Sequence, residues 1–256
     1  MCLIVIAYNY HPEYKLIFAA NRDEFYKRPS SAADFWIDEP SLLAGRDLKE
    51  GGTWCGITRN GRFAAITNYR DMKSIKKDAL SRGTIVTDFL LGNSSAEEHS
   101  RNLMSSSDLY NGYGLIFGER NDLFFLSNQT KKLVKIKPGI HGLSNHLLDT
   151  PWFKVRKGKE LLKKAIDKKD TLVDDLFLML SDKTLSPKKE LPDTGLPKDI
   201  EKKISSIFVE TPDYGTRSST VILKDKKDTV TFIEKSLDTE TKKWNINAFK
   251  FEMTLT

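Results

Sequence analysis

Cysteine is scarce in this chain, and its scarcity limits the chemistry to be expected. The 256 residues include two cysteines, Cys2 and Cys55, and no CxxC pair. Two cysteines are too few for a disulfide framework, and their spacing is not that of a zinc or dithiol redox site. The four histidines show no metalloprotease spacing. The sequence therefore predicts no bound metal and favours a reducing compartment, which we take to be the cytoplasm.

Long hydrophobic runs are also missing. No stretch approaches the roughly 20 apolar residues of a membrane-spanning helix. The apolar start of the chain is too short for a secretory signal and lacks the basic residues that precede one. We therefore expect no integral membrane segment. The chain has no internal repeat or low-complexity tract, and its 256 residues suit one domain over 1–256.

Negative charge is in the minority, with 35 acidic residues against 41 lysines and arginines and a net charge of +6. Many of the lysines fall between Lys154 and Lys169, where a lysine-rich helix face is typical of a solvated surface. The aromatic residues that interleave with basic ones in nucleic-acid grooves are not evident. We expect no nucleic-acid partner and a modest attraction for amphipathic anionic ligands.

What the chain does have is a cysteine at its start. Residues 1–7, Met-Cys-Leu-Ile-Val-Ile-Ala, form a short apolar run typical of a buried strand. If Met1 is removed, Cys2 carries a thiol with a reference pKa of about 8.5 and a free α-amine at about 7.7–8.0. A nucleophile and its base then share one residue, which is the smallest arrangement that can start acyl transfer. The alternative is a small buried cysteine that follows a retained methionine.

A second apolar run, 15–20, follows a short polar turn, and together the two runs predict an antiparallel hairpin. The tetrapeptide Asn21-Arg22-Asp23-Glu24 comes next, at the expected end of the second strand. In a hairpin this end lies beside the start of the first strand, so we expect these side chains near Cys2. An arginine there would lower the thiol pKa, and a carboxylate would orient the α-amine. A charged loop that ends a strand is the alternative.

The rest of the chain alternates between predicted strands and helices. Residues 25–50 are expected to be irregular, and 182–198 to form a long loop or flap. Expected strands cover 55–58 and 63–67 around an Asn60-Gly61 turn, then 113–118, 123–127, 133–137, 139–145, 218–224, 229–236 and 244–253. Expected helices cover 83–91, a segment capped by Ser94 or Ser95, a segment opened by Thr150-Pro151, then 172–180 and 199–208. This order predicts an α+β fold of largely antiparallel sheets covered by helices.

Six polar motifs recur in this order, several of them where strands end. They are Asn21-Arg22-Asp23-Glu24, Gly45-Arg46-Asp47, Gly51-Gly52-Thr53-Trp54, Thr67-Asn68-Tyr69-Arg70, Gly142-Leu143-Ser144-Asn145 and Tyr214-Gly215-Thr216-Arg217. With the N-terminal Met-Cys, these motifs make the chain resemble the NRDE family, the relatives of the transport and Golgi organisation protein. The similarity covers essentially the whole chain.

That family in turn resembles the N-terminal-nucleophile hydrolases, in particular the cysteine branch of choloylglycine hydrolases and penicillin V acylases. The resemblance implies a four-layer αββα sandwich. It also implies acyl transfer through a thioester, on a small amide or on a thioester such as an acyl-coenzyme A, without a cofactor. The residues implied to be catalytic are Cys2, Arg22, Asp23, Asn68, Asn145 and Arg217.

In the implied mechanism, Cys2 attacks the carbonyl with its own α-amine as base. Asn68 donates to the developing oxyanion, with Asn145 or a backbone N–H as a further donor. Arg22 and Arg217 flank the sulfur and tie down the loops.

The carboxylate that holds the amine is left open. The hydrolase branch usually spaces its arginine and aspartate by three, whereas Arg22 and Asp23 are adjacent, so Glu24 is an alternative to Asp23.

A non-catalytic function is compatible with the same motifs. The resembled family is associated with lipid and acyl-coenzyme A metabolism and with haem handling, so the fold could serve a haem or acyl-lipid binding and trafficking protein. Asparagines at strand ends commonly bond turn backbone, and Arg217 could simply pair with Asp23. His141 and His146 are expected to be ordinary polar residues rather than haem ligands.

Overall fold

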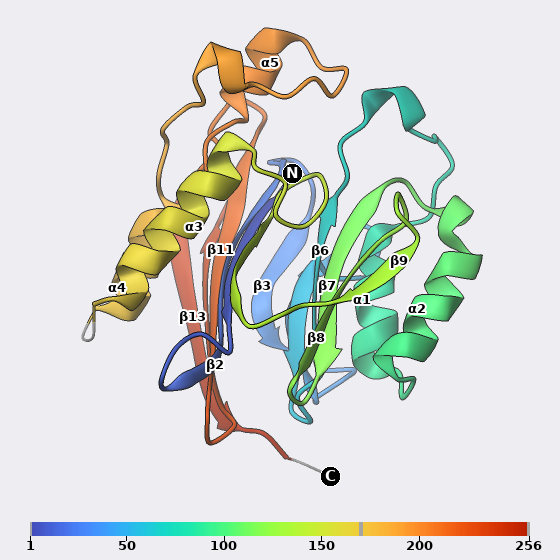
Figure 1. Cartoon of the computed structure of the whole chain (residues 1–256), viewed down its shortest axis with the longest axis vertical. Helices are drawn as coiled ribbons and strands as arrows, with labels where there is room; N and C mark the ends of the chain where they lie inside the picture. The colour runs from blue at the N-terminus through green and yellow to red at the C-terminus, as the bar shows by residue number, and fades with distance from the viewer. Residues whose placement is uncertain (1, 169–170, 255–256) are drawn as a thin grey trace.

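The computed structural model describes residues 2–168 and 171–254. Two antiparallel sheets pack face to face at its centre (Figure 1). Sheet A has the order β10-β1-β2-β11-β12-β13, and sheet B runs from β3 to β9 in sequence order. The strands of sheet A are β1 (Cys2–Tyr8), β2 (Tyr14–Phe25), β10 (Gly139–Leu143), β11 (Tyr214–Asp225), β12 (Thr229–Leu237) and β13 (Trp244–Glu252). Those of sheet B are β3 (Ser30–Phe35), β4 (Leu42–Asp47), β5 (Cys55–Thr58), β6 (Phe63–Asn68), β7 (Tyr113–Glu119), β8 (Asp122–Ser127) and β9 (Lys132–Lys135).

Helices cover the outer face of each sheet. The helices are α1 (Arg82–Leu91), α2 (Ala96–Ser105), α3 (Phe153–Ile166), α4 (Leu172–Leu180) and α5 (Lys198–Lys203), with short 3-10 turns η1 (Met72–Ser74), η2 (Ser107–Leu109) and η3 (Lys188–Glu190). Helices α1 and α2 contact sheet B, and α3 and α4 contact sheet A. Helix α5 lies at the end of the molecule where the chain starts (Figure 1). No described helix is both long and apolar enough to cross a membrane.

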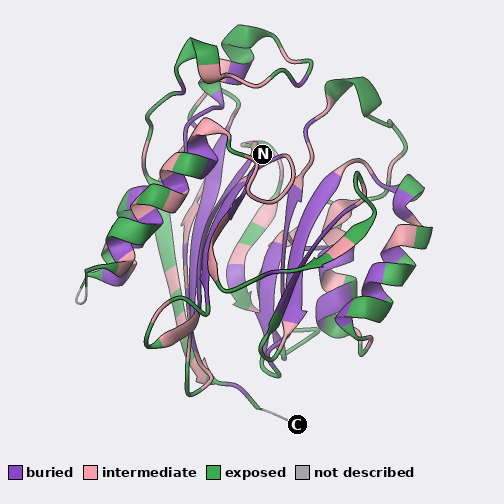
Figure 2. Cartoon of the chain, in the orientation of Figure 1, coloured by how far each residue is buried: buried purple, intermediate pink, exposed green. Residues whose placement is uncertain are grey.

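Three apolar layers separate the four layers of secondary structure, and the buried strands run between them (Figure 2). Alternation along β1 shows why: Ile4 and Ile6 face sheet B, whereas Leu3 and Val5 face α3 and α4. A strand buried on both faces must be apolar at every position, as this one is. The αββα sandwich expected from the sequence is confirmed.

The sequence expectations were wrong at several boundaries. Residues 25–50 are not irregular, because they contain β3 and β4 at one edge of sheet B. Strand β2 continues through the polar tetrapeptide to Phe25, where it pairs with Tyr214 of β11. Helix α5 ends at Lys203 rather than near Phe208.

Two helix starts had opposite outcomes. Ser95 caps α2 by accepting a hydrogen bond from the Glu98 amide at 3.2 Å, as predicted. Helix α3 begins at Phe153 rather than at the predicted Thr150-Pro151. The Thr150 hydroxyl does not cap the helix, because it hydrogen-bonds His146 instead.

Candidate functional site

The first hairpin places Cys2 directly opposite Arg22 in the β1–β2 register. Paired residues share a face of the sheet, so both side chains face the space between the two sheets. The Arg22 guanidinium is buried and stacks on the Trp54 ring at 4.2 Å. It lies 3.8 Å from a Glu24 carboxylate oxygen and 3.9 Å from one of Asp47. The expected neighbourhood of Cys2 and the tetrapeptide is therefore present.

Asn21 and Asp23 occupy the other face of β2, because side chains alternate along a strand. The Asn21 amide donates to the carbonyls of Leu180 and Ile207 at 2.8 and 2.9 Å and accepts from the Ser219 hydroxyl. Asn21 thus fastens the end of α4 and the chain before β11 to the sheet.

Asp23 lies near the end of β2 and is buried on the face of the sheet that packs against α3. One of its oxygens accepts a 2.7 Å hydrogen bond from Thr216, and the other lies 3.9 Å from the Lys154 ammonium. Burial raises the pKa of the Asp23 carboxyl, with the Lys154 charge opposing it, and burial lowers the pKa of Lys154. The site therefore contains a buried carboxyl–ammonium pair beside β1.

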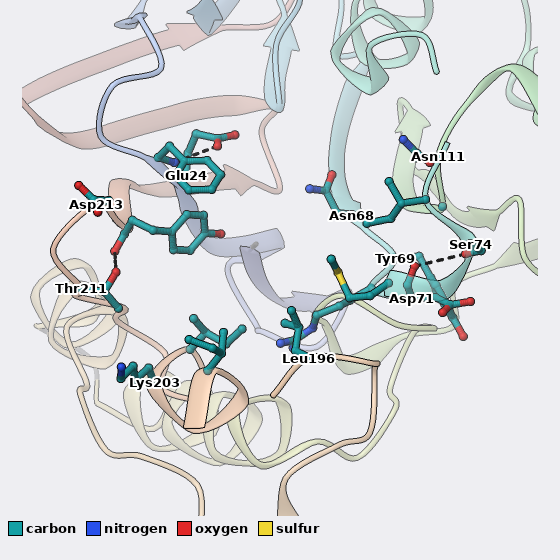
Figure 3. Close-up of a pocket in the computed structure, with 18 of the residues that line it drawn as sticks. Glu24, Asn68, Tyr69, Asp71, Ser74, Asn111, Leu196, Lys203, Thr211 and Asp213 are labelled. Carbon is teal, nitrogen blue, oxygen red and sulfur yellow. Dashed lines mark hydrogen bonds between the residues drawn. The ribbon is translucent and has the colours of Figure 1, made fainter. Parts of the chain in front are cut away.

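The two predicted asparagines meet each other across strand ends. Asn145 has a left-handed backbone (φ 55°), and its Nδ2 donates to the Asn68 carbonyl at 2.9 Å. The Asn145 carbonyl accepts from the Arg70 amide at 2.8 Å, and the Ser144 hydroxyl donates to the Cys2 carbonyl at 2.9 Å. Asn145 therefore ties β6 to the end of β10, and the Asn68 side chain is directed into a cavity (Figure 3).

Arg217 belongs to β11, two strands away from β1 in sheet A. It sits at a β-bulge between Thr216 and Ser218, where the β11 register to β2 shifts. Its guanidinium donates to the carbonyls of Phe25 and of two other residues in the loop after β2, at 2.9–3.1 Å. Arg217 lines a cavity of about 330 Å³ that shares Arg22 and Trp54 with the pocket lined by Cys2. It anchors the β2–β3 loop, and its expected role beside the sulfur stays a prediction.

Cys2 lines a polar pocket of about 250 Å³ at the open end of the sandwich. This pocket adjoins a larger cavity of about 580 Å³, whose lining is mainly apolar. Four residues belong to both linings, namely Glu24, Asn68, Arg82 and Asn111. Figure 3 shows Glu24 and Asn68 on opposing walls of the larger cavity. The larger cavity is closed on one side by α5 and the segment before it, through Leu196 and Ile200.

Three polar residues of the site escaped the sequence analysis: Arg82, Asn111 and Lys154. Arg82 is the first residue of α1, and its guanidinium donates to the Gly112 carbonyl at 3.0 Å. Burial lowers its pKa, and the nearby Cys2 and Glu24 act in the opposite direction. Lys154 was expected on a solvated helix face but is 3% exposed, so that expectation was wrong. No local pattern distinguishes Lys154 from the surface lysines that follow it.

The two histidines that were expected to be ordinary polar residues rather than haem ligands, His141 and His146, both have polar partners. His146 contacts the Tyr69 hydroxyl and the Thr150 hydroxyl through its two ring nitrogens, each at 2.8 Å. His141 contacts Asp149 at 2.7 Å and the Lys137 carbonyl at 2.9 Å, and the Asp149 hydrogen bond raises the His141 pKa. Both rings are thus held by hydrogen bonds within the protein.

The fold and the site together describe the architecture of the molecule. It is an αββα sandwich with a cysteine on its first strand, beside an arginine, buried carboxyls and a cavity.

The chain belongs to the Transport and Golgi organisation 2 family, whose model matches residues 1–239. It is 37% identical to the Transport and Golgi organization protein 2 homolog of Bos taurus and 34% identical to that of Homo sapiens, with 99% of each chain covered. The resemblance predicted from the six motifs is confirmed. Among solved structures, the chain is similar to an N-acylethanolamine-hydrolyzing acid amidase ortholog of Caenorhabditis elegans. That similarity has a TM-score of 0.43 at 10% identity and covers 87% of this chain and 92% of the other.

Proposed function

We propose that this protein is a cysteine hydrolase or acyltransferase that acts on an amide or thioester of an apolar acyl chain. The observation that carries the proposal is the junction of two cavities. The polar pocket around Cys2 adjoins an apolar cavity of about 580 Å³ through the shared walls Glu24, Asn68 and Arg82. An acyl chain suits the apolar side, and the reacting carbonyl then reaches the polar side where the sulfur lies.

The chemistry begins once Met1, which lies outside the described residues, has been removed. The Cys2 sulfur forms a bond to the carbonyl carbon while the α-amine takes the thiol proton. The amine or thiol of the leaving group departs with that proton, which leaves a thioester on Cys2. Water then attacks the thioester, releases the carboxylic acid and restores the thiol. An acyltransferase replaces this water by another acceptor.

The remaining site residues divide into two groups in this proposal. Asn68 and Arg22 serve at the reacting centre: the amide of Asn68 donates to the oxyanion, and the Arg22 charge favours the thiolate. Asp23 holds the α-amine from the helix side, which leaves Glu24 as part of the cavity wall. Asn145 and Arg217 act as positioning residues, because their donors hold the Asn68 carbonyl and the β2–β3 loop.

A binding protein for haem or acyl lipids is the second candidate, favoured by the size and apolar lining of the cavity. The haem version has the weaker support, since both nitrogens of His141 and of His146 are hydrogen-bonded within the protein. An acyl-coenzyme A suits either candidate. We place the protein in the cytoplasm as part of the proposal, because Cys2 and Cys55 are both free thiols.

The experiment is intact-mass analysis of the full chain incubated with a short-chain acyl thioester. We expect loss of the initiator methionine and a one-to-one acyl adduct. The adduct should be absent in Cys2→Ala and present in Cys55→Ala, which removes the other thiol and so serves as the matched control. Asn68→Ala should form the adduct about 10²–10³ times more slowly, because one oxyanion donor is lost.

Two results would contradict the proposed enzymatic activity. A retained methionine on active protein is incompatible with an α-amine base at Cys2. Turnover that persists in Cys2→Ala would exclude the thioester. Tight binding of the acyl thioester without any adduct would favour the binding protein.

A further inference from the structure

Exposed apolar side chains gather around the mouth of the cavity. The described residues include fifteen large hydrophobic side chains that are exposed, and five of them line the two adjoining pockets. These five are Phe25, Met72, Ile75, Leu80 and Ile200, with exposed fractions of 36–59%. Scattered single apolar residues are normal on a protein surface, whereas a group around one opening marks an interaction site.

Most of these side chains stand on two segments, which we call the lips. One lip is residues 72–80, which includes η1, and the other is residues 198–203, which is α5. Both project from the end of the molecule where the chain starts, and both are largely exposed (Figures 1 and 2). The first lip is hydrogen-bonded to the segment that leads into α5, since the Met72 amide donates to the Thr194 carbonyl at 3.0 Å.

Both lips are positively charged. The first has Lys73, Lys76 and Lys77 against a single aspartate. The second also has three lysines, and one of its two acidic residues, Glu201, is buried against Arg70 at 2.8 Å. Each lip therefore presents three lysines and one exposed acidic residue beside its apolar side chains.

We propose that the two lips dock on the surface of an anionic phospholipid bilayer. Ile75, Met72 and Ile200 enter the headgroup boundary, and the lysines contact the lipid phosphates and carboxylates. The cavity between the lips then faces the membrane, where amphipathic acyl compounds reside. A bilayer suits this surface better than a folded partner, because the apolar residues stand on two separate lips around an open cavity. The inference does not require Cys2 chemistry.

The test is co-sedimentation of the full chain with vesicles of phosphatidylcholine, with and without phosphatidylserine. We expect sedimentation that depends on phosphatidylserine and weakens as salt is added, because the lysine contribution is screened. Ile75→Asp should weaken vesicle binding by about tenfold or more, since it replaces an inserted aliphatic side chain by a charge of the wrong sign. Lys73→Glu with Lys77→Glu should remove the dependence on phosphatidylserine.

Ile37→Asp is the matched control. Ile37 is 98% exposed and follows β3, whose first residue Ser30 pairs with Asp47 of the Cys2 pocket, so the strand leads away from the mouth. It should bind vesicles like the unchanged protein, as should Cys2→Ala, so failure of the chemistry is separable from failure of docking. Equal binding to both vesicles, no binding, or the same loss in Ile37→Asp would each overturn the inference. So would a dimer in the absence of vesicles that Ile75→Asp dissociates, because the lips would then belong to a second copy.

Discussion

Glu234, on β12, has an exposed fraction of 1% and lines a cavity together with Arg22 and Trp54. It accepts hydrogen bonds from the Ala33 amide at 2.7 Å and the Thr220 hydroxyl at 3.3 Å. Burial raises its pKa from 4.5 to about 7, and these hydrogen bonds only partly offset the effect. The side chain therefore keeps its proton at pH values where the same residue in the unfolded chain has lost it.

This difference makes stability depend on pH. Between pH 4.5 and about 7 the native state binds more protons than the unfolded chain, so the free energy of unfolding falls as pH rises. The contribution of Glu234 is fully present below pH 4.5 and is lost by about pH 7, a change of roughly 3 kcal/mol. Urea unfolding of the unchanged protein and Glu234→Gln across this range should show the variant with the flatter profile. Parallel profiles for the two proteins would contradict the assignment.

At the residue scale, the sequence could place what lies within one hairpin. Cys2 and Arg22 are twenty residues apart and face each other because the turn between their strands is short. Lys154 and Arg82 belong to helices, and their positions at the site depend on how those helices pack on the sheets. Arg217 shows a further limit: its motif was recognised, but the sequence did not indicate the bulge in β11 at which this residue sits.

At the scale of elements, the segment from 182 to 204 is held over the cavity by ion pairs of contrasting burial. Arg70, just after β6, pairs with Glu201 of α5 at 2.8 Å, and both side chains are buried. Glu201 also accepts a hydrogen bond from Thr194. Arg156 of α3 pairs with Glu190 in the same segment, but the Arg156 side chain is 52% exposed.

The two pairs should differ in their contribution to stability. Arg70→Met leaves the Glu201 charge buried without its partner, which should cost about 3–5 kcal/mol. The double variant Arg70→Met with Glu201→Gln should recover much of this loss, because no charge then remains unpaired. Urea unfolding, with limited proteolysis within 182–204, measures both effects.

Glu190→Gln is the comparison for this prediction. It removes a pair at the surface that tethers the same segment, and should cost less than about 1 kcal/mol. Similar losses from the buried and the exposed pair, or a double variant as unstable as Arg70→Met, would show that Arg70 and Glu201 are not coupled.

The element scale also shows why some boundaries could not be predicted. Local patterns of apolar residues and turns were enough to predict the strands β1, β5, β6 and β7 and the helix α4. The extension of β2 through its polar tetrapeptide does not, because its partner β11 lies about 190 residues further along the chain. Strand β3 was missed because it exposes alternate polar residues at a sheet edge and has few apolar positions to reveal it.

At the scale of the whole molecule, function depends on how the four layers are spaced. The strand order of sheet A joins β1 and β2 from the start of the chain, β10 from its middle and three strands from its end. The αββα order was predicted from the resemblance, whereas the alternation of elements predicted only an α+β fold of sheets covered by helices. The spacing between layers was not predicted, because it depends on side chains that meet across layers.

Gly158 sets this spacing for the layer that carries Cys2. A Cβ at this position of α3 would lie 2.9 Å from Val5 Cγ1 and 3.4 Å from Leu3 Cδ2, both on β1. Gly158→Leu should therefore push α3 away from β1, with a loss near the upper end of the roughly 1–3 kcal/mol typical of overpacking. That loss exceeds the gain of about 1 kcal/mol from replacing glycine within a helix.

The same change should slow formation of the Cys2 acyl adduct, because β1 would move with respect to Asn68 and Arg22. Lys163→Leu adds the same side chain to the exposed face of α3 and should change the free energy of unfolding by no more than about 0.5 kcal/mol. Thermal unfolding and the rate of adduct formation should be measured for both variants. The comparison separates the effect of close packing from the effect of helix propensity. If Gly158→Leu were as stable and as reactive as Lys163→Leu, then the contact between α3 and β1 would not control the position of Cys2.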